Sequence, residues 1–213
     1  MAIKIKYKIK SIDKSQTTEW LKYKHYAKRI PPIEYAFGLF NETNLMQGIV
    51  TYSTPVSSNL RGIFNNEFKL MELNRLVINE GLEKNCLSFL VSQSLKMLPT
   101  PLVIISYADT SQNHHGYIYQ ATNWIYTGMT KSRTDKYVEG SKHSRHYNNE
   151  NQNGLRKYRS AKHRYIYFAT SKTKRKEYMK KLNYQIEPYP KGENKKYKLG
   201  TFIEPIVIDT NAS

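Results

Sequence analysis

The chain has 213 residues, which is enough for one large domain with a full hydrophobic core. Its single cysteine, Cys86, excludes an intramolecular disulfide and a zinc site built from cysteines. The sequence contains no apolar run of membrane-spanning length and no signal peptide, so we expect a cytoplasmic protein without a membrane partner.

The charge of the chain is strongly positive and unevenly distributed. With 34 Lys and Arg against 17 Asp and Glu, the net charge is +17. Residues 1–30 carry nine basic and two acidic groups, residues 31–130 five and seven, and residues 131–200 twenty and six. Basic ends around a near-neutral middle indicate a polyanionic partner, with nucleic acid favoured over a membrane surface. Tyrosines among the C-terminal Lys and Arg suit base stacking beside phosphate contacts, although ordinary strands also contain them.

Apolar periodicity predicts the strands and helices, and Gly, Pro and Asn mark the turns. In chain order the predicted elements are a strand over 1–10, a helix over 17–28, hairpin strands over 33–40 and 45–53, a strand over 70–79, a helix over 85–98, a strand over 102–109, a short helix over 114–122 and a strand over 124–128. Ser15 or Thr17 is expected to cap the first helix, and Pro31 and Pro32 to stop it. This order predicts an α/β fold with a mixed central sheet flanked by helices.

The sequence changes character after residue 130. Residues 131–162 are basic, polar and weakly periodic, and we expect a mobile loop there. Residues 163–213 predict a strand, a basic helix and extended chain. We expect them to pack as a basic C-terminal extension on the core formed by residues 1–130, within the same domain.

Two charged residues lie where a hydrophobic core does not need them. Arg75 is in the middle of a predicted strand, where alternation places it on one face with Leu73 and Val77. A buried guanidinium needs an anionic partner, so Arg75 is expected either to hold an anionic group at a site or to pair with Glu72 or Asp109. Asp109 ends a buried strand, the usual place for ligand-binding residues, and is a candidate base for an amine. It is equally a common residue with which to start a turn.

Other polar residues give weaker indications. Asn85 and Ser88 begin a predicted helix, whose free N–H groups and dipole favour an anion, although capping alone would explain Asn85. Four histidines leave a catalytic metal open, but we assign no metal ligand; they are His114, His115, His143 and His146.

Several blocks of sequence occur together in a known order. They include ELNRLVI, LVIISYAD and GYIYQATNWIYTG. In these blocks the chain resembles the Mom family of phage DNA-modification enzymes, which are similar in fold to the GNAT acyltransferases. The resemblance runs from about His25 to Gly192 and implies a GNAT-like fold.

The resemblance also implies a function. Mom proteins convert adenine in phage DNA to N6-(carbamoylmethyl)adenine, which shields the DNA from restriction enzymes of the bacterial host. Carried over by position, the functional residues of the family are His25, Tyr26, Arg75, Ser88, Asp109 and Tyr119. Because the N6 group is engaged in the duplex, we expect double-stranded DNA to be bound with the adenine flipped out.

The identity of the acyl donor is left between acetyl-CoA and glycyl-tRNA. GNAT enzymes hold the pyrophosphate of coenzyme A with a Gly-rich loop, but the corresponding segment here, INEGLEKNCLS, has only Gly81. Glycine has the atoms of the carbamoylmethyl group, so glycyl-tRNA is preferred and tRNA becomes a second partner. Asn85 and Ser88 are expected to bind the donor. Iron is a further candidate cofactor, and a homodimer is left open.

The basic C-terminal part is expected to hold the DNA backbone. The residues assigned to this role are Arg156, Arg159, Lys162, Arg164, Lys172 and Lys174. Two other functions remain open, namely a metal-dependent nuclease that uses the four histidines and a nucleic-acid-binding protein without catalysis. The second explains the charge but not why Arg75, Ser88 and Asp109 would lie together.

Overall fold

The chain folds around one large mixed β-sheet. The computed structural model describes residues 3–57, 60, 64, 68–138, 154–193, 198–201 and 204–209. The strands are β1 Lys8–Ser11, β2 Tyr35–Phe40, β3 Met46–Ser53, β4 Leu70–Ile78, β5 Leu102–Asp109, β6 Ile125–Met129, β7 Arg133–Lys136, β8 Leu155–Arg159, β9 Lys162–Ala169 and β10 Val207–Asp209. The helices are α1 Ile3–Lys6, α2 Cys86–Met97, α3 Tyr117–Ala121 and α4 Lys172–Lys180, with short 3₁₀ or π turns η1 Lys14–Thr17, η2 Trp20–Lys24 and η4 Thr110–Gln112.

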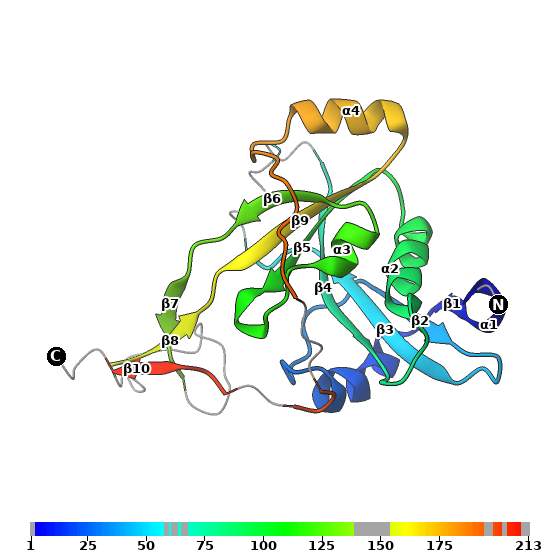
Figure 1. Ribbon diagram of the computed structural model, residues 1–213, viewed down its shortest axis with the longest axis horizontal. Coiled ribbons are helices and arrows are strands. Elements are labelled where there is room, and N and C mark those ends of the chain that lie inside the picture. Colours follow the sequence, from blue (N-terminus) through cyan, green and yellow to red (C-terminus); the bar gives the residue numbers. More distant parts are fainter. Residues whose placement is uncertain are drawn as a thin grey trace.

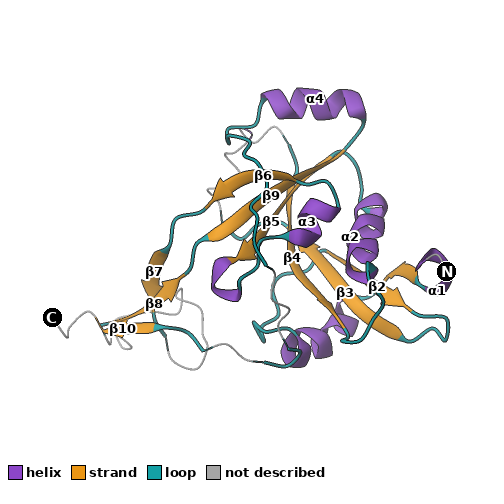
Figure 2. Cartoon of the chain, viewed as in Figure 1, coloured by secondary structure: helices purple, strands orange, loops and turns teal. Residues whose placement is uncertain are grey.

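Seven strands form the main sheet in the order β1-β2-β3-β4-β5-β9-β6, and only the β4–β5 pair is parallel. Helices α2 and α3 pack on one face against the largest apolar cluster, which includes Leu90, Ile104 and Trp124. The other face is covered by η2 and α4. We call these the α2 face and the α4 face (Figures 1 and 2). The predicted α/β fold with a mixed sheet flanked by helices is therefore confirmed.

The N-terminal strand is shorter than predicted. Only Lys8–Ser11 pair with β2, because β2 ends at Phe40, opposite Lys8, and residues before Lys8 have no strand to join. Ile3–Lys6 form a helical turn instead.

The next helix also differs from the prediction. Its cap is Asp13, in a reciprocal pair with Gln16, rather than Ser15 or Thr17. The helix ends in a π turn at Lys24, four residues earlier than predicted, and His25 leaves it in an extended conformation. Single π turns occur often at functional sites.

The C-terminal part of the chain is more ordered, and more central, than predicted. Residues 131–162, predicted as a loop, contain β7 and β8, while residues 139–153 lie outside the described part. Strand β9 lies inside the main sheet, between β5 and β6. Strands β7, β8 and β10 form a second, small sheet at the end of the molecule opposite the N-terminus (Figure 1).

The longest helix in the described part of the chain is α2, with 12 residues. None of the helices there has the length and hydropathy of a bilayer-spanning segment.

Candidate active site

The two parallel strands of the main sheet separate halfway along their length. They pair only through Leu70, Met71 and Glu72 of β4, and the last pair joins Glu72 to Ile105. Beyond it, Ser106 Oγ donates a hydrogen bond to the Leu73 carbonyl oxygen (2.8 Å), while the backbone of β5 continues along β9 alone. We call this point, from Glu72 and Ile105 onward, the β4–β5 fork.

A one-residue bulge in β4 decides which side chains point towards each face. Leu73 pairs with Tyr52 and Arg75 with Thr51, so Asn74 is an extra residue. The prediction that Leu73 and Arg75 share a face is therefore wrong, because the bulge reverses the alternation between them. Leu73 packs in the cluster of the α2 face, and Arg75 lies on the α4 face with Glu72.

Arg75 is half-buried and only partly satisfied. Its Nη1 donates to the Asn74 carbonyl oxygen (2.6 Å), whereas its enclosed Nε has no hydrogen-bond partner among the described residues. Within that part of the chain, Arg75 forms no ion pair with Glu72 or Asp109, the two partners considered from the sequence. Burial lowers the pKa of Arg75. A cation in this state is arranged to bind an oxygen that the described residues do not supply.

His25 and Tyr26 lie beside Arg75. The two rings stack at a centroid distance of 4.4 Å, and the edge of Tyr26 faces His114 at 6.4 Å. His25 Nδ1 accepts a hydrogen bond from the Ala27 N–H (3.1 Å), which places the proton of the neutral ring on Nε2. Burial, with the charges of Arg75 and His114, lowers the pKa of His25 to about 3. His25 is therefore neutral at physiological pH.

Glu72 is a site residue that the sequence analysis considered only as a partner for Arg75. Its half-buried carboxylate forms no hydrogen bond or ion pair with the described residues. Burial raises its pKa, against the opposite effects of Arg75 and Lys162. The three-residue spacing of Glu72 and Arg75 would place them on opposite faces of a regular strand, so the bulge that brings them together hid this carboxylate.

Tyr119 reaches the fork from the α2 face. Its hydroxyl hydrogen-bonds Ser106 Oγ (2.7 Å), the group that bridges to Leu73. Burial raises the pKa of Tyr119, and the charges of Tyr26 and Glu72 act in the same direction. The phenol is therefore protonated at neutral pH and lies close to groups of the α4 face.

Asp109 is held by other partners than Arg75. Its carboxylate accepts hydrogen bonds from Ser160 Oγ and from the N–H and Oγ of Ser111, and it pairs with Lys162 Nζ at 3.0 Å. Burial raises its pKa, but Lys162 and the serine hydrogen bonds outweigh this, and the pKa lies below its ordinary value. Asp109 also caps η4, so it starts a turn, as one of the two interpretations from the sequence expected. These contacts make it a weak base.

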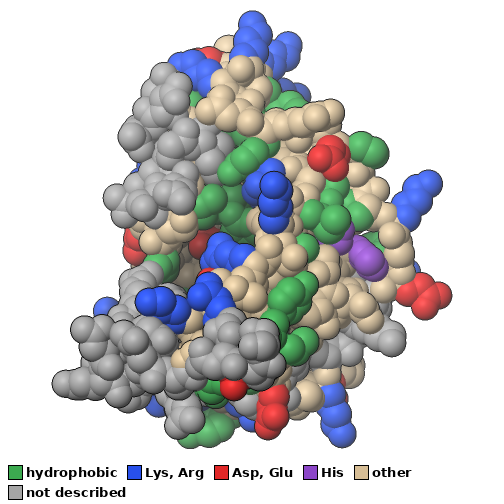
Figure 3. Space-filling view, turned by 90° about the vertical axis from the view of Figure 1, so that its left-hand side faces the viewer, with side chains coloured by type: hydrophobic (Ala, Val, Ile, Leu, Met, Phe, Trp, Pro, Cys, Tyr) green, Lys and Arg blue, Asp and Glu red, His purple; other side chains and the backbone are tan. Residues whose placement is uncertain are grey.

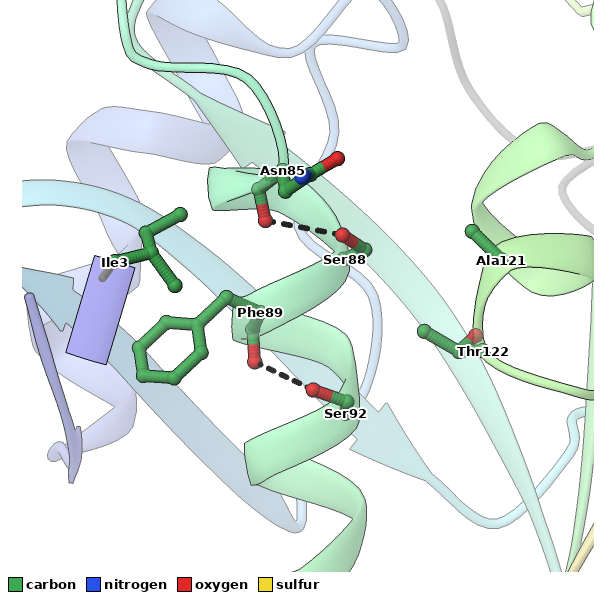
Figure 4. A pocket seen from close by; sticks show the side chains of 7 residues that line it. All are labelled: Ile3, Asn85, Ser88, Phe89, Ser92, Ala121 and Thr122. Carbon is green, nitrogen blue, oxygen red and sulfur yellow. Dashed lines mark hydrogen bonds between the residues drawn. The ribbon is translucent and has the colours of Figure 1, made fainter. Parts of the chain in front are cut away.

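Asn85 and Ser88 lie apart from this group, in a pocket of about 370 Å³ on the α2 face. The pocket lies between the first turns of α2 and the end of α3, and is lined by Ile3, Asn85, Ser88, Phe89, Ser92, Ala121 and Thr122 (Figure 4). Asn85 has a left-handed backbone (φ 74°) and makes no side-chain cap, so capping does not explain it. Ser88 and Ser92 donate their protons within α2, which leaves their oxygens as acceptors.

The fit of a coenzyme A group to this pocket is partial. The free N–H groups of the first α2 turn suit a phosphate. The described residues that line the pocket include no Lys or Arg, and the segment before α2 holds only Gly81, at φ 73°. The described lining therefore suits a neutral arm better than a pyrophosphate.

Most of the cations predicted to hold DNA have partners inside the protein. Arg156 donates to Thr134 and Arg164 to Thr127, while Arg159 pairs with Asp135 and Lys162 with Asp109. Lys172 and Lys174 are exposed on α4. Seen from the end that carries the small sheet, Lys and Arg side chains gather beside hydrophobic ones (Figure 3).

The described residues contain no group of three His, Cys, Asp or Glu side chains that could hold a metal ion. His114 contacts Tyr26, and His115 lies beside His163 at 5.6 Å between ring centroids. His143 and His146 lie outside the described residues.

Comparison with known proteins gives one family and a set of distant structural relatives. A family model described as the Mom protein family matches residues 6–191. The methylcarbamoylase Mom of Escherichia phage Mu is 26% identical over 186 residues, covering 79% of this chain and 77% of that protein. The spermidine/spermine N-acetyltransferase SpeG from Vibrio cholerae covers 79% of this chain and 95% of its own, with a TM-score of 0.48 and 9% identity. The ribosomal-protein-S5-alanine acetyltransferase from Vibrio fischeri covers 76% and 93%, with a TM-score of 0.47 and 11% identity.

Proposed function

The chain belongs to the Mom protein family, and on that premise we propose that it is a transferase that modifies phage DNA. The product we propose is N6-(carbamoylmethyl)adenine, which protects the DNA from restriction enzymes of the bacterial host. Support comes from the relative in phage Mu, which is named a methylcarbamoylase. The observation that carries the proposal is the β4–β5 fork, where Glu72, Arg75 and Tyr119 come together from both faces of the sheet.

Transfer to adenine N6 requires a base, because the lone pair of this exocyclic amine is delocalised into the ring. We propose that the base is Glu72 rather than Asp109. The raised pKa of Glu72 suits proton abstraction near neutral pH, whereas Asp109 is stabilised as a carboxylate by Lys162 and two serines. Asp109 then acts as a positioning residue that fixes Lys162 and the turn after β5.

The remaining groups have complementary roles in this proposal. Arg75, with an unsatisfied Nε, binds the carbonyl oxygen of the transferred group as negative charge develops on it. Tyr119, a protonated phenol, supplies the proton to the leaving group. Neutral His25 and Tyr26 form a stacking wall for a flipped adenine on the α4 face.

The donor we propose is an activated glycyl ester. Attack of N6 on its carbonyl carbon breaks the ester bond, releases the alcohol of the carrier and forms N6-glycyladenine. A rearrangement that bonds N6 to the methylene carbon and the glycyl nitrogen to the carbonyl carbon then gives the carbamoylmethyl isomer without gain or loss of atoms.

We propose that the donor enters through the pocket of Asn85 and Ser88, because α3 connects that pocket to Tyr119. We favour glycyl-tRNA over acetyl-CoA, because an acetyl group lacks the nitrogen atom of the proposed product. A glycyl group is an isomer of the carbamoylmethyl group, and the described lining of the pocket, which has no Lys or Arg, favours a donor whose phosphates are bound elsewhere.

The proposed function is tested by restriction protection. Plasmid DNA from cells that produce the protein is digested with a panel of restriction enzymes, beside plasmid from cells that produce Arg75→Ala. We expect resistance to a subset of enzymes with the wild type and full digestion with the variant. Full digestion in both cases, with soluble and folded protein, counts against DNA modification.

A further inference from the structure

Tyr107 of β5 lies at the β4–β5 fork, on the same face of the sheet as Glu72. It follows Ile105, the partner of Glu72 in the last pair of the parallel ladder, by two residues. Side chains two residues apart on a strand point to the same face, and their Cα atoms lie about 7 Å apart. Tyr107 packs against the apolar cluster of the α4 face, which includes Ile105 and Ile166. Its ring therefore borders the site just beyond the carboxylate proposed as the catalytic base.

Strand β4 does not pair with β5 at the level of Tyr107. The ladder of β4 with β5 covers only Leu70 to Glu72, and the later residues of β4 pair with β3. In an uninterrupted parallel ladder the neighbour of Tyr107 would be Asn74. Asn74 is instead the bulge residue, and its side chain is hydrogen-bonded to β3 and to the segment before β2. On the side of β4, Tyr107 therefore faces the fork.

The hydroxyl of Tyr107 has no hydrogen-bond partner among the described residues. On the side of β9 the paired residue is Arg164, and its guanidinium extends to β6. It donates to Thr127 Oγ1 (2.9 Å) and to the Thr127 carbonyl oxygen (2.6 Å), and it lies over the Tyr184 ring at 3.4 Å. Burial raises the pKa of Tyr107, and the charge of Glu72 acts in the same direction. The half-buried phenol is therefore protonated at neutral pH and has a proton to donate.

Glu72 and Tyr107 together present an acceptor and a donor on one face of the fork. The Watson–Crick edge of adenine carries the complementary pair, because its N6 amino group donates and the adjacent N1 accepts. Enzymes that flip a base out of the duplex read it through hydrogen bonds to this edge. Guanine and thymine present a carbonyl oxygen and an N–H at the same places, so Glu72 would face an oxygen. Cytosine carries the adenine pattern on a smaller ring, so the pair distinguishes amino bases from oxo bases.

We propose that the Tyr107 hydroxyl donates a hydrogen bond to N1 of the flipped adenine while Glu72 accepts one from N6. This inference rests on the proposed function for the identity of the nucleobase. It makes Tyr107 a specificity-determining residue of the fork. A hydrogen bond to N1 also draws electron density from the ring and makes the N6 proton more acidic, so Tyr107 assists proton abstraction by Glu72.

Binding of single-stranded oligothymidine with one central adenine tests this role without a donor. Replacing the adenine by 1-deazaadenine, in which a C–H group takes the place of N1, should weaken binding to wild type about two- to tenfold, the usual effect of one hydrogen bond. An oligonucleotide with 7-deazaadenine should bind as the adenine one does. Tyr107→Phe keeps the ring and should bind adenine and 1-deazaadenine equally, both as weakly as wild type binds 1-deazaadenine. The matched control is Tyr167→Phe, a half-buried tyrosine of β9 that packs on the α2 face and should keep the wild-type preference.

Two results would overturn the role of Tyr107. The first is wild-type protein that binds adenine and 1-deazaadenine equally, and it needs no variant, so it applies even if Tyr107→Phe does not fold. The second is an equal loss from 1-deazaadenine in wild type and in Tyr107→Phe. Nucleoside analysis of DNA from cells that produce the wild type separates this inference from the proposed function. Modified adenine together with either result refutes the role of Tyr107 alone, whereas unmodified adenine refutes the proposed function.

Discussion

Asn74 is the residue on which the geometry of the site depends. Its side chain accepts a hydrogen bond from Thr51 and donates to Ser53 Oγ (2.9 Å) and to the Pro32 carbonyl oxygen (3.0 Å). These bonds hold the bulge and attach the segment after His25 to the sheet. The bulge in turn places Arg75 beside Glu72.

Sequence reasoning identified four of the residues that meet around the fork, namely His25, Tyr26, Arg75 and Tyr119. Arg75 could be found because a charge in an apolar strand is costly, and the others followed from the family blocks. Glu72 could not be recognised as a free carboxylate, because a bulge leaves no mark in hydrophobic periodicity. Asp109 was expected to act directly. Its carboxylate is instead held by Ser160 and Lys162, which lie 51 or more residues further along the chain, and the sequence has no local signal for such contacts.

The first prediction separates the two carboxylates. Glu72→Gln should fold normally and lose about 10²–10⁴-fold in modification rate, the usual cost of removing a positioned base. Asp109→Asn should melt earlier, because Lys162 and the 109–112 turn lose their anion, and should keep more activity per folded molecule. Rates and melting temperatures measured on the same preparations test this. If Asp109→Asn lost more activity per folded molecule than Glu72→Gln, the base would be Asp109 instead.

The second prediction concerns His25 and pH. Its folded pKa of about 3 lies below the ordinary 6.5, so the neutral ring stabilises the fold. This contribution is complete above pH 6.5 and is lost as the pH falls towards 3, with a slope of up to about 1.4 kcal/mol per pH unit. In His25→Asn the slope of unfolding free energy against pH should be smaller by that amount. His163 and the carboxylates are present in both wild type and His25→Asn. If unfolding free energy depended on pH with the same slope in both proteins, His25 would not be held neutral in the fold.

At the scale of elements, the basic residues divide into two groups that composition cannot distinguish. Strand β8 and the start of β9 point their arginines at threonines and an aspartate of neighbouring segments. Helix α4 exposes nearly all its cations and buries only Tyr178.

Helices and strands in the middle of the chain were predicted within a few residues, because each has an unbroken apolar pattern. The ends of the first helix and strand depended on π geometry and on the length of β2, which are tertiary properties.

The third prediction tests this division by charge reversal. Lys172→Glu together with Lys174→Glu should leave the melting temperature unchanged and reduce the slope of duplex DNA affinity against salt concentration by about 2. Arg159→Glu should lower the melting temperature, because it places a carboxylate against Asp135. Thermal melting and DNA titration at several salt concentrations provide the comparison. Early melting of the α4 variant would show that this helix has a structural role instead.

At the scale of the whole molecule, the core predicted as residues 1–130 lacks an internal strand of its own sheet. Strand β6 pairs only with β9, and β9 also covers the full length of β5. The sequence reveals β9 as a strand but not its position, because insertion between two earlier strands is a long-range pairing without a local signal.

The fourth prediction follows from this topology. A chain that ends at Ser160 should show no cooperative unfolding, because β6 and one edge of β5 lose their partners and the α4 face loses Ile166 and Phe168. A chain that ends at Thr201 lacks, among the helices and strands of the described residues, only β10, which pairs through three residues, and it should unfold cooperatively. Calorimetry of both chains checks this. A cooperative transition in the shorter chain would show that the first 160 residues fold alone.

The central claim is that the β4–β5 fork transfers a group to adenine N6 in DNA. Its most direct test is mass spectrometry of nucleosides from DNA of cells that produce the protein, with fragmentation to distinguish N6-(carbamoylmethyl)- from the isomeric N6-glycyl-deoxyadenosine. We expect a deoxyadenosine heavier by one carbamoylmethyl group with the wild type, and its loss with Glu72→Gln and Arg75→Ala. Unmodified deoxyadenosine in the presence of folded wild-type protein, or undiminished modification by both variants, would contradict the account.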